Sequence, residues 1–154
     1  GTYSRLKITG VWSFGGGTVT VRHNLVVAAG AVLNDHSTSP LTTVHVGGNV
    51  LVGKGGIVGL GTYNPAAPHD SVVDGNVIAN QPLSLYISFT TIHGNLISHG
   101  GGGGVAGEFR NYPTKDNTID GNVVIRDGER LTLDVRVDER PPEHELRRKR
   151  PANR

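Results

Sequence analysis

Three titratable residues of this sequence occupy the same place in a repeated segment, two positions before a recurring Asn: Asp74, His93 and Asp120. If the segments stack as neighbouring strands, these side chains lie on one face about 4.8 Å apart. A carboxylate–imidazole–carboxylate row can act as an acid/base pair or hold a cation such as Zn²⁺. Such a row is more often an ordinary polar surface. We therefore treat the three as candidates for catalysis and His93 as the candidate metal ligand, and expect no cofactor.

The other groups that could do chemistry have more ordinary interpretations. Lys54 and Arg110 could each be the base of a polysaccharide lyase, but isolated cations in turns and loops are commonly solvated. The pairs Asp35-His36 and His69-Asp70 favour turn formation over metal binding. The serines lack the strand–turn–helix setting of a hydrolase nucleophile, and the glycine runs lack the Lys-Ser/Thr of a phosphate loop. Aromatic residues could stack on sugars but are expected to pack mainly in the core, at coil ends and in loops: Trp12, Phe14, Tyr63, Tyr86, Phe89, Phe109 and Tyr112.

The elements that would position these residues are predicted by an internal repeat. Five segments align on one Asn: TVTVRHNLVV, TTVHVGGNVLV, SVVDGNVIA, TTIHGNLIS and NTIDGNVVI. The separations between the aligned asparagines are 25, 27, 19 and 27 residues; the asparagines are Asn24, Asn49, Asn76, Asn95 and Asn122. These variable lengths favour a right-handed parallel β-helix of about five coils over a left-handed helix with a fixed period of about 18 residues.

Two aliphatic columns flank the Asn, and both are predicted to face inward. One lies three residues before it, and the other, two residues after it, reads Val26, Leu51, Ile78, Ile97 and Val124. Gly at 48, 75, 94 and 121 is expected to relieve the limits on backbone angles at a sharp bend. The asparagines are predicted to form a hydrogen-bonded ladder from coil to coil. Further strands are predicted at 31–33, 57–60 and 83–87, with longer loops at 34–41, 61–70 and 98–117.

The composition changes after Gly128, since no Gly occurs in the last 26 residues. We predict a β-helix domain over 1–138, closed by a capping strand within 131–137, and a charged, disordered tail over 139–154. The alternative is that residues 129–154 replace a truncated repeat. Of the 15 Lys and Arg residues, nine lie at or beyond Arg126, so the folded part is not basic and a nucleic-acid partner is not expected.

Composition excludes several other classes. Gly accounts for 23 of 154 residues, which disfavours a helical bundle. Cys is absent, so disulfides and thiolate metal sites cannot form. No apolar run approaches the ~20 residues of a membrane helix, and no signal-peptide pattern is present, so an exported protein would be represented by its mature form.

The segments VHVGGNVLVGKGGIVGLG, DGNVIANQPLSLYI and KDNTIDGNVVI resemble secreted actinobacterial proteins of uncharacterised function that are built from Gly-Asn-Val coils. These proteins are similar in outline to right-handed, pectate-lyase-like β-helix repeats. The resemblance covers residues 17–127, and it implies export and a location at or outside the cell surface. It implies no catalytic motif.

From these observations we expect a secreted or cell-surface structural protein that acts as a rigid scaffold or assembly unit, with no catalytic site evident, and that associates with itself end to end or side by side. The alternative is a protein that binds or cleaves extracellular polysaccharide as a lyase, hydrolase or epimerase. A third is a metal-binding surface protein.

Overall fold

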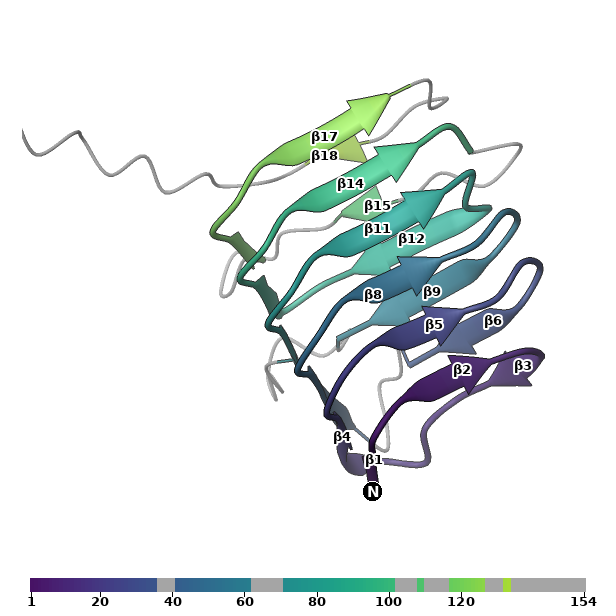
Figure 1. The fold of residues 1–154 in the computed structure, drawn as a ribbon, viewed down its shortest axis with the longest axis vertical. Helices are drawn as coiled ribbons and strands as arrows, with labels where there is room; N and C mark the ends of the chain where they lie inside the picture. The colour runs from purple at the N-terminus through teal and green to yellow at the C-terminus, as the bar shows by residue number, and fades with distance from the viewer. Residues whose placement is uncertain (36–40, 62–70, 102–107, 110–116, 127–131, 134–154) are drawn as a thin grey trace, which may run out of the picture.

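The chain winds through three parallel β-sheets, visiting them in the same order on each pass (Figure 1). The computed structural model describes residues 1–35, 41–61, 71–101, 108–109, 117–126 and 132–133. Every strand pair in the described part of the chain is parallel and joins strands three apart in the order of the chain, as when β10 pairs with β7 and β13. This arrangement is a parallel β-solenoid.

Each sheet holds six strands. Sheet A contains β1 (Thr2–Tyr3), β4 (Gly17–Val21), β7 (Thr42–Val46), β10 (Ser71–Val73), β13 (Thr90–Ile92) and β16 (Thr118–Ile119). Sheet B contains β2 (Leu6–Ile8), β5 (Leu25–Val27), β8 (Val50–Val52), β11 (Val77–Asn80), β14 (Leu96–His99) and β17 (Val123–Arg126). Sheet C contains β3 (Val11–Trp12), β6 (Val32–Asn34), β9 (Ile57–Leu60), β12 (Ser84–Ile87), β15 (Glu108–Phe109) and β18 (Thr132–Leu133).

The predicted all-β solenoid architecture is confirmed, with one addition. About five coils are predicted from the Asn repeat, whereas the strands β1, β2 and β3 add a sixth level before Asn24. Sequence reasoning missed this level because it carries no Asn at the aligned corner. The predicted strands near 31–33, 57–60 and 83–87 correspond to β6, β9 and β12.

The core is formed by inward columns from all three sheets, and one predicted column was assigned to the wrong face. The residues three before each Asn do face inward: Val21, Val46, Val73 and Ile92 are at most 1 % exposed. The residues two after each Asn face outward and are half-buried. Their neighbours on both sides fill the core instead, as Leu25 and Val27 do around Val26. A strand alternates its faces with period two, so shifting the inward position by one residue exchanges the two faces.

The glycines before each Asn are required by a close approach between coils, not by backbone angles. A Cβ at Gly75 would lie 2.6 Å from Asn49 Oδ1 and 2.7 Å from Gly48 O, and a Cβ at Gly94 would lie 2.5 Å from Gly75 O. None of Gly48, Gly75, Gly94 and Gly121 has a positive φ. The predicted reason for these glycines was therefore wrong: only a residue without a side chain can lie so close to the preceding coil.

The asparagines themselves are joined by hydrogen bonds from one coil to the next. Asn95 donates to Asn76 Oδ1 through both its main-chain N–H, at 2.8 Å, and its side-chain amide, at 2.9 Å. Asn76 makes the same two bonds to Asn49. Asn122 makes them to Asn95, and the main chain of Asn49 donates to Asn24 Oδ1 at 2.9 Å.

The C-terminal predictions are only partly covered by the described residues. Strand β18 lies within the segment 131–137 and pairs with β15, with Glu108 opposite Thr132. The predicted tail at 139–154, most of the three predicted loops and the truncation alternative lie outside the described part of the chain. Within that part, no helix has the length and apolar character needed to cross a membrane.

Candidate functional site

The outer face of sheet A carries the three residues first singled out, but they are divided between two separate pairs, one of which includes His45. The register aligns Val73 with Ile92 and Ile92 with Ile119, so the next residues, Asp74, His93 and Asp120, lie on neighbouring strands as expected. His93 Nδ1 lies 2.7 Å from Asp120 Oδ2. Asp74 is paired instead with His45, whose Nε2 lies 3.2 Å from Asp74 Oδ2.

His45 reaches Asp74 diagonally, because His45 itself pairs with Val72 in the register. Sequence reasoning missed His45 because it lies four positions before its Asn, in the outward column next to the one that was read. The signal was available: on a strand, positions two apart share a face, so His45 is a diagonal neighbour of Asp74 on the next strand.

The chemistry open to these pairs is limited by their exposure. The side chains of His45 and Asp74 are 47 % and 45 % exposed, and those of His93 and Asp120 are 50 % and 53 % exposed. Exposed pairs of this kind contribute about 0.2–1 kcal/mol to stability. Across the residues that the structure describes, no three His, Asp or Glu side chains gather as a metal site would require. Each pair could move a proton, but neither lies among the residues that line the two hollows described below.

The remaining candidates from the sequence are dispersed. Lys54 is exposed in the turn between β8 and β9. Arg110, His36, His69 and Asp70 lie outside the described residues, as do Tyr63 and Tyr112. Nothing in the described part brings Lys54 into a group with an acidic residue.

Asp35, predicted to shape a turn, is instead buried in the core. It follows β6, its main-chain N–H donates to Gly59 O at 3.1 Å, and only 2 % of the residue is exposed. Burial raises the pKa of its carboxyl from 3.8 to about 7, against a smaller lowering by the Thr42 side chain and the Phe14 main chain. Among the residues that the structure describes, neither carboxyl oxygen of Asp35 nor the Thr42 hydroxyl meets full hydrogen-bond geometry with a partner. The effect of burial on this pKa outweighs the lowering by Thr42 and Phe14.

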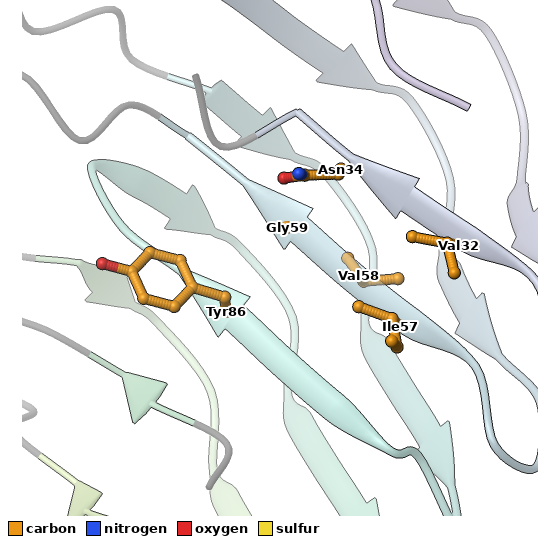
Figure 2. A pocket seen from close by; sticks show the side chains of 6 residues that line it. All are labelled: Val32, Asn34, Ile57, Val58, Gly59 and Tyr86. Carbon is orange, nitrogen blue, oxygen red and sulfur yellow. The ribbon is translucent and has the colours of Figure 1, made fainter. Parts of the chain in front are cut away.

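The outer face of sheet C is hollowed between three strands, as Figure 2 shows. Gly59 of β9 has no side chain, and it lies in register between Asn34 of β6 and Tyr86 of β12. The hollow measures about 410 Å³ and is floored by aliphatic residues that include Val32 and Ile57. It therefore combines a partly exposed aromatic ring with an exposed amide, above an apolar floor.

The other described aromatic residues are not gathered on this face. Phe89 is 2 % exposed and Phe14 packs against the core, as predicted for most of the group. Trp12 is 56 % exposed on β3, at the first level of the solenoid. Tyr86 was named among the aromatics, but its setting was not foreseen, because the hollow depends on a Gly in the neighbouring coil.

Comparison with known proteins adds no relative. No family model matches the chain, and neither the curated proteins nor the solved structures contain a significant match. What is established is the architecture, a parallel β-solenoid with three parallel sheets.

Proposed function

We propose that the chain is a secreted or cell-surface structural protein in which the solenoid acts as a rigid scaffold or assembly unit. The observation that carries this proposal is the axial continuity of the stack. Sheet B is paired without a break from β2 to β17, and the Asn corner beside it is hydrogen-bonded from Asn24 to Asn122. A column of this kind resists bending because each level is tied to the next along its length.

The scaffold role predicts that the stack opens cooperatively. Native-state hydrogen exchange should show similar protection for the main-chain N–H groups of the interior levels, which are bonded to the adjacent coil. Interior levels that open independently of one another would contradict the proposal. So would turnover of a polysaccharide, detected as new reducing or unsaturated ends.

We also infer that the winding is right-handed and that the asparagines act as a structural ladder. Crossovers between parallel strands are right-handed in about 98 % of cases, and coil lengths between 19 and 27 residues do not follow a fixed hexapeptide period. An experimentally phased density map with a left-handed path would overturn the handedness. The location outside the cell is tested by fractionation of the source organism with an antibody to this chain.

The second candidate function is binding of an extracellular polysaccharide, and the sheet C hollow favours it. Sugar rings present apolar C–H faces to aromatic side chains and hydroxyls to amides. Tyr86 and Asn34 offer these two groups on opposite sides of Gly59 (Figure 2). In a polysaccharide array, Tyr86→Ala should lose any binding that the natural chain shows. Tyr3→Ala, which removes an exposed tyrosine 43 % accessible on β1, is the matched control.

A further inference from the structure

The outer face of sheet B carries an unbroken aliphatic column, one residue per strand from β5 to β17. Its members are half-buried and in direct register: Val26, Leu51, Ile78, Ile97 and Val124. The core does not need them, because the residues on either side of each already point inward. With strands about 4.8 Å apart, the column is about 19 Å long. An apolar stripe on an outer face is a mark of an interaction surface.

The next outward column of the same face is divided by side-chain size. Its first half consists of Ala28 and Gly53, and its second half of His99 and Arg126, both exposed. Asn80, also exposed, lies between the halves and pairs in register with His99. The small half is hollowed, with a volume of about 420 Å³. One half of the face thus projects and the other half is recessed.

This division makes the face complementary to itself. Consider a two-fold axis that runs along strand β11 and parallel to the sheet. It places a second copy with its sheet B facing the first, and the levels of the second copy follow in the reverse order. Ile78 then meets Ile78 of the second copy, Leu51 meets Ile97, and Val26 meets Val124. In the neighbouring column the projecting His99 lies over the recessed Gly53, Arg126 lies over Ala28, and the two Asn80 side chains meet at the centre.

We propose that sheet B is the face through which two copies of this chain pair, side by side and antiparallel. The inference deepens the assembly role proposed above and rests on it. The paired strands of each face cover about 24 Å by 13 Å, so the two copies together bury about 600 Å², less than the ~1,200 Å² of a stable interface, and the contact is a weak, transient one. We therefore expect a concentration-dependent dimer with a Kd between about 10 µM and about 1 mM.

The absence of Cys from the natural sequence allows the arrangement to be tested by cross-linking single-Cys variants. Facing sheets lie about 10 Å apart, within reach of a bis-maleimide with a spacer of about 8 Å. Asn80→Cys should cross-link to itself. Arg126→Cys alone should not, because the two copies of residue 126 are separated by four levels, about 19 Å along the axis. A mixture of Ala28→Cys and Arg126→Cys should cross-link.

Substitutions on sheet B test the proposed contact without a cross-linker. Leu51→Lys should abolish the dimer in sedimentation equilibrium, whereas Val72→Lys, at a half-buried outward position of sheet A, should leave it intact. Lys7 extends the aliphatic column by one level, so it approaches Arg126 of the second copy, and Lys7→Glu should tighten the dimer. The cross-linking result does not depend on whether the lysine variants fold.

Each other outcome counts against the pairing. A natural chain that stays monomeric up to about 1 mM overturns it, as does a dimer in which Asn80→Cys fails to cross-link. Loss of the dimer through Val72→Lys but not Leu51→Lys places the contact on sheet A instead. A monomeric chain with cooperative hydrogen exchange would refute the pairing alone, whereas independent opening of the levels would refute the scaffold role.

Discussion

Asp35 makes the stability of the solenoid depend on pH in a direction unusual for a carboxyl group. Its pKa in the folded chain is about 7, against 3.8 when solvated. Between these values the folded state binds a proton that the unfolded state does not, so stability falls as pH rises. The contribution is complete below about pH 4, decreases through the interval and is lost above about pH 7.

The size of the effect follows from the two pKa values. Each tenfold change in proton affinity corresponds to about 1.4 kcal/mol. The difference between 3.8 and about 7 therefore makes about 4 kcal/mol of the free energy of unfolding pH-dependent. This is a large part of the ~5–15 kcal/mol that stabilises a typical domain. It arises because burial withdraws the carboxylate from water, and the Thr42 side chain and the Phe14 main chain offset only part of that cost.

The assay is urea unfolding followed by far-UV circular dichroism at several pH values between 4 and 8. Asp35→Asn keeps the shape but cannot ionise, so its stability relative to the natural chain should improve by about 4 kcal/mol from pH 4 to pH 8. The comparison cancels every other titrating group. Thr42→Val, which removes a group that lowers the Asp35 pKa, should retain the pH dependence and extend it to higher pH. Parallel pH profiles for the natural chain and Asp35→Asn would refute the reasoning.

Three further predictions concern the corner and the surface pairs. Gly75→Ala should lower the free energy of unfolding by about 1–3 kcal/mol, because the added Cβ meets the preceding coil. Gly10→Ala is the control and should leave it unchanged, because a Cβ there meets no described atom within 4 Å. Thermal unfolding measures both variants. Asn76→Ala should lower the free energy of unfolding by about 1–3 kcal/mol, because two donors of Asn95 lose their acceptor. Asn122→Ala should lower it by less, because it removes a single side-chain donor. Equal costs for the two Asn variants would contradict a ladder. His45→Ala and His93→Ala should each change the free energy of unfolding by at most about 1 kcal/mol. A larger loss in urea unfolding would show that the two His–Asp pairs contribute more than exposed ion pairs usually do.

Sequence reasoning found the coil because the repeat is local and periodic. The Asn spacing predicted which segments lie on neighbouring coils. The column that contains Val21 and Val46 was correctly assigned to the core. The first level was missed because β1, β2 and β3 lack the Asn. The role of Gly75 could not be derived from its own segment, because the atom that excludes a Cβ belongs to the previous coil.

The candidate site was predicted less well, and for a related reason. The alignment of Asp74, His93 and Asp120 followed from the repeat, but the partner of Asp74 depends on side-chain direction, which favoured His45. The burial of Asp35 could not be read from its loop-like neighbours. The sheet C hollow needs Gly59 between Asn34 and Tyr86, a combination of three coils that no single segment displays.

The outward column of sheet B was misassigned because its strands are aliphatic on both faces. Runs such as Leu25–Val27 and Val50–Val52 have no polar residue from which the solvent face could be recognised. In parallel sheets such continuous runs are typical of strands that are covered on both sides. Sheet A, by contrast, presents outward residues such as Thr20, His45 and Thr91. The sequence of sheet B is therefore typical of a sheet whose outer face is covered. A second copy of the chain, paired through this face, would cover it.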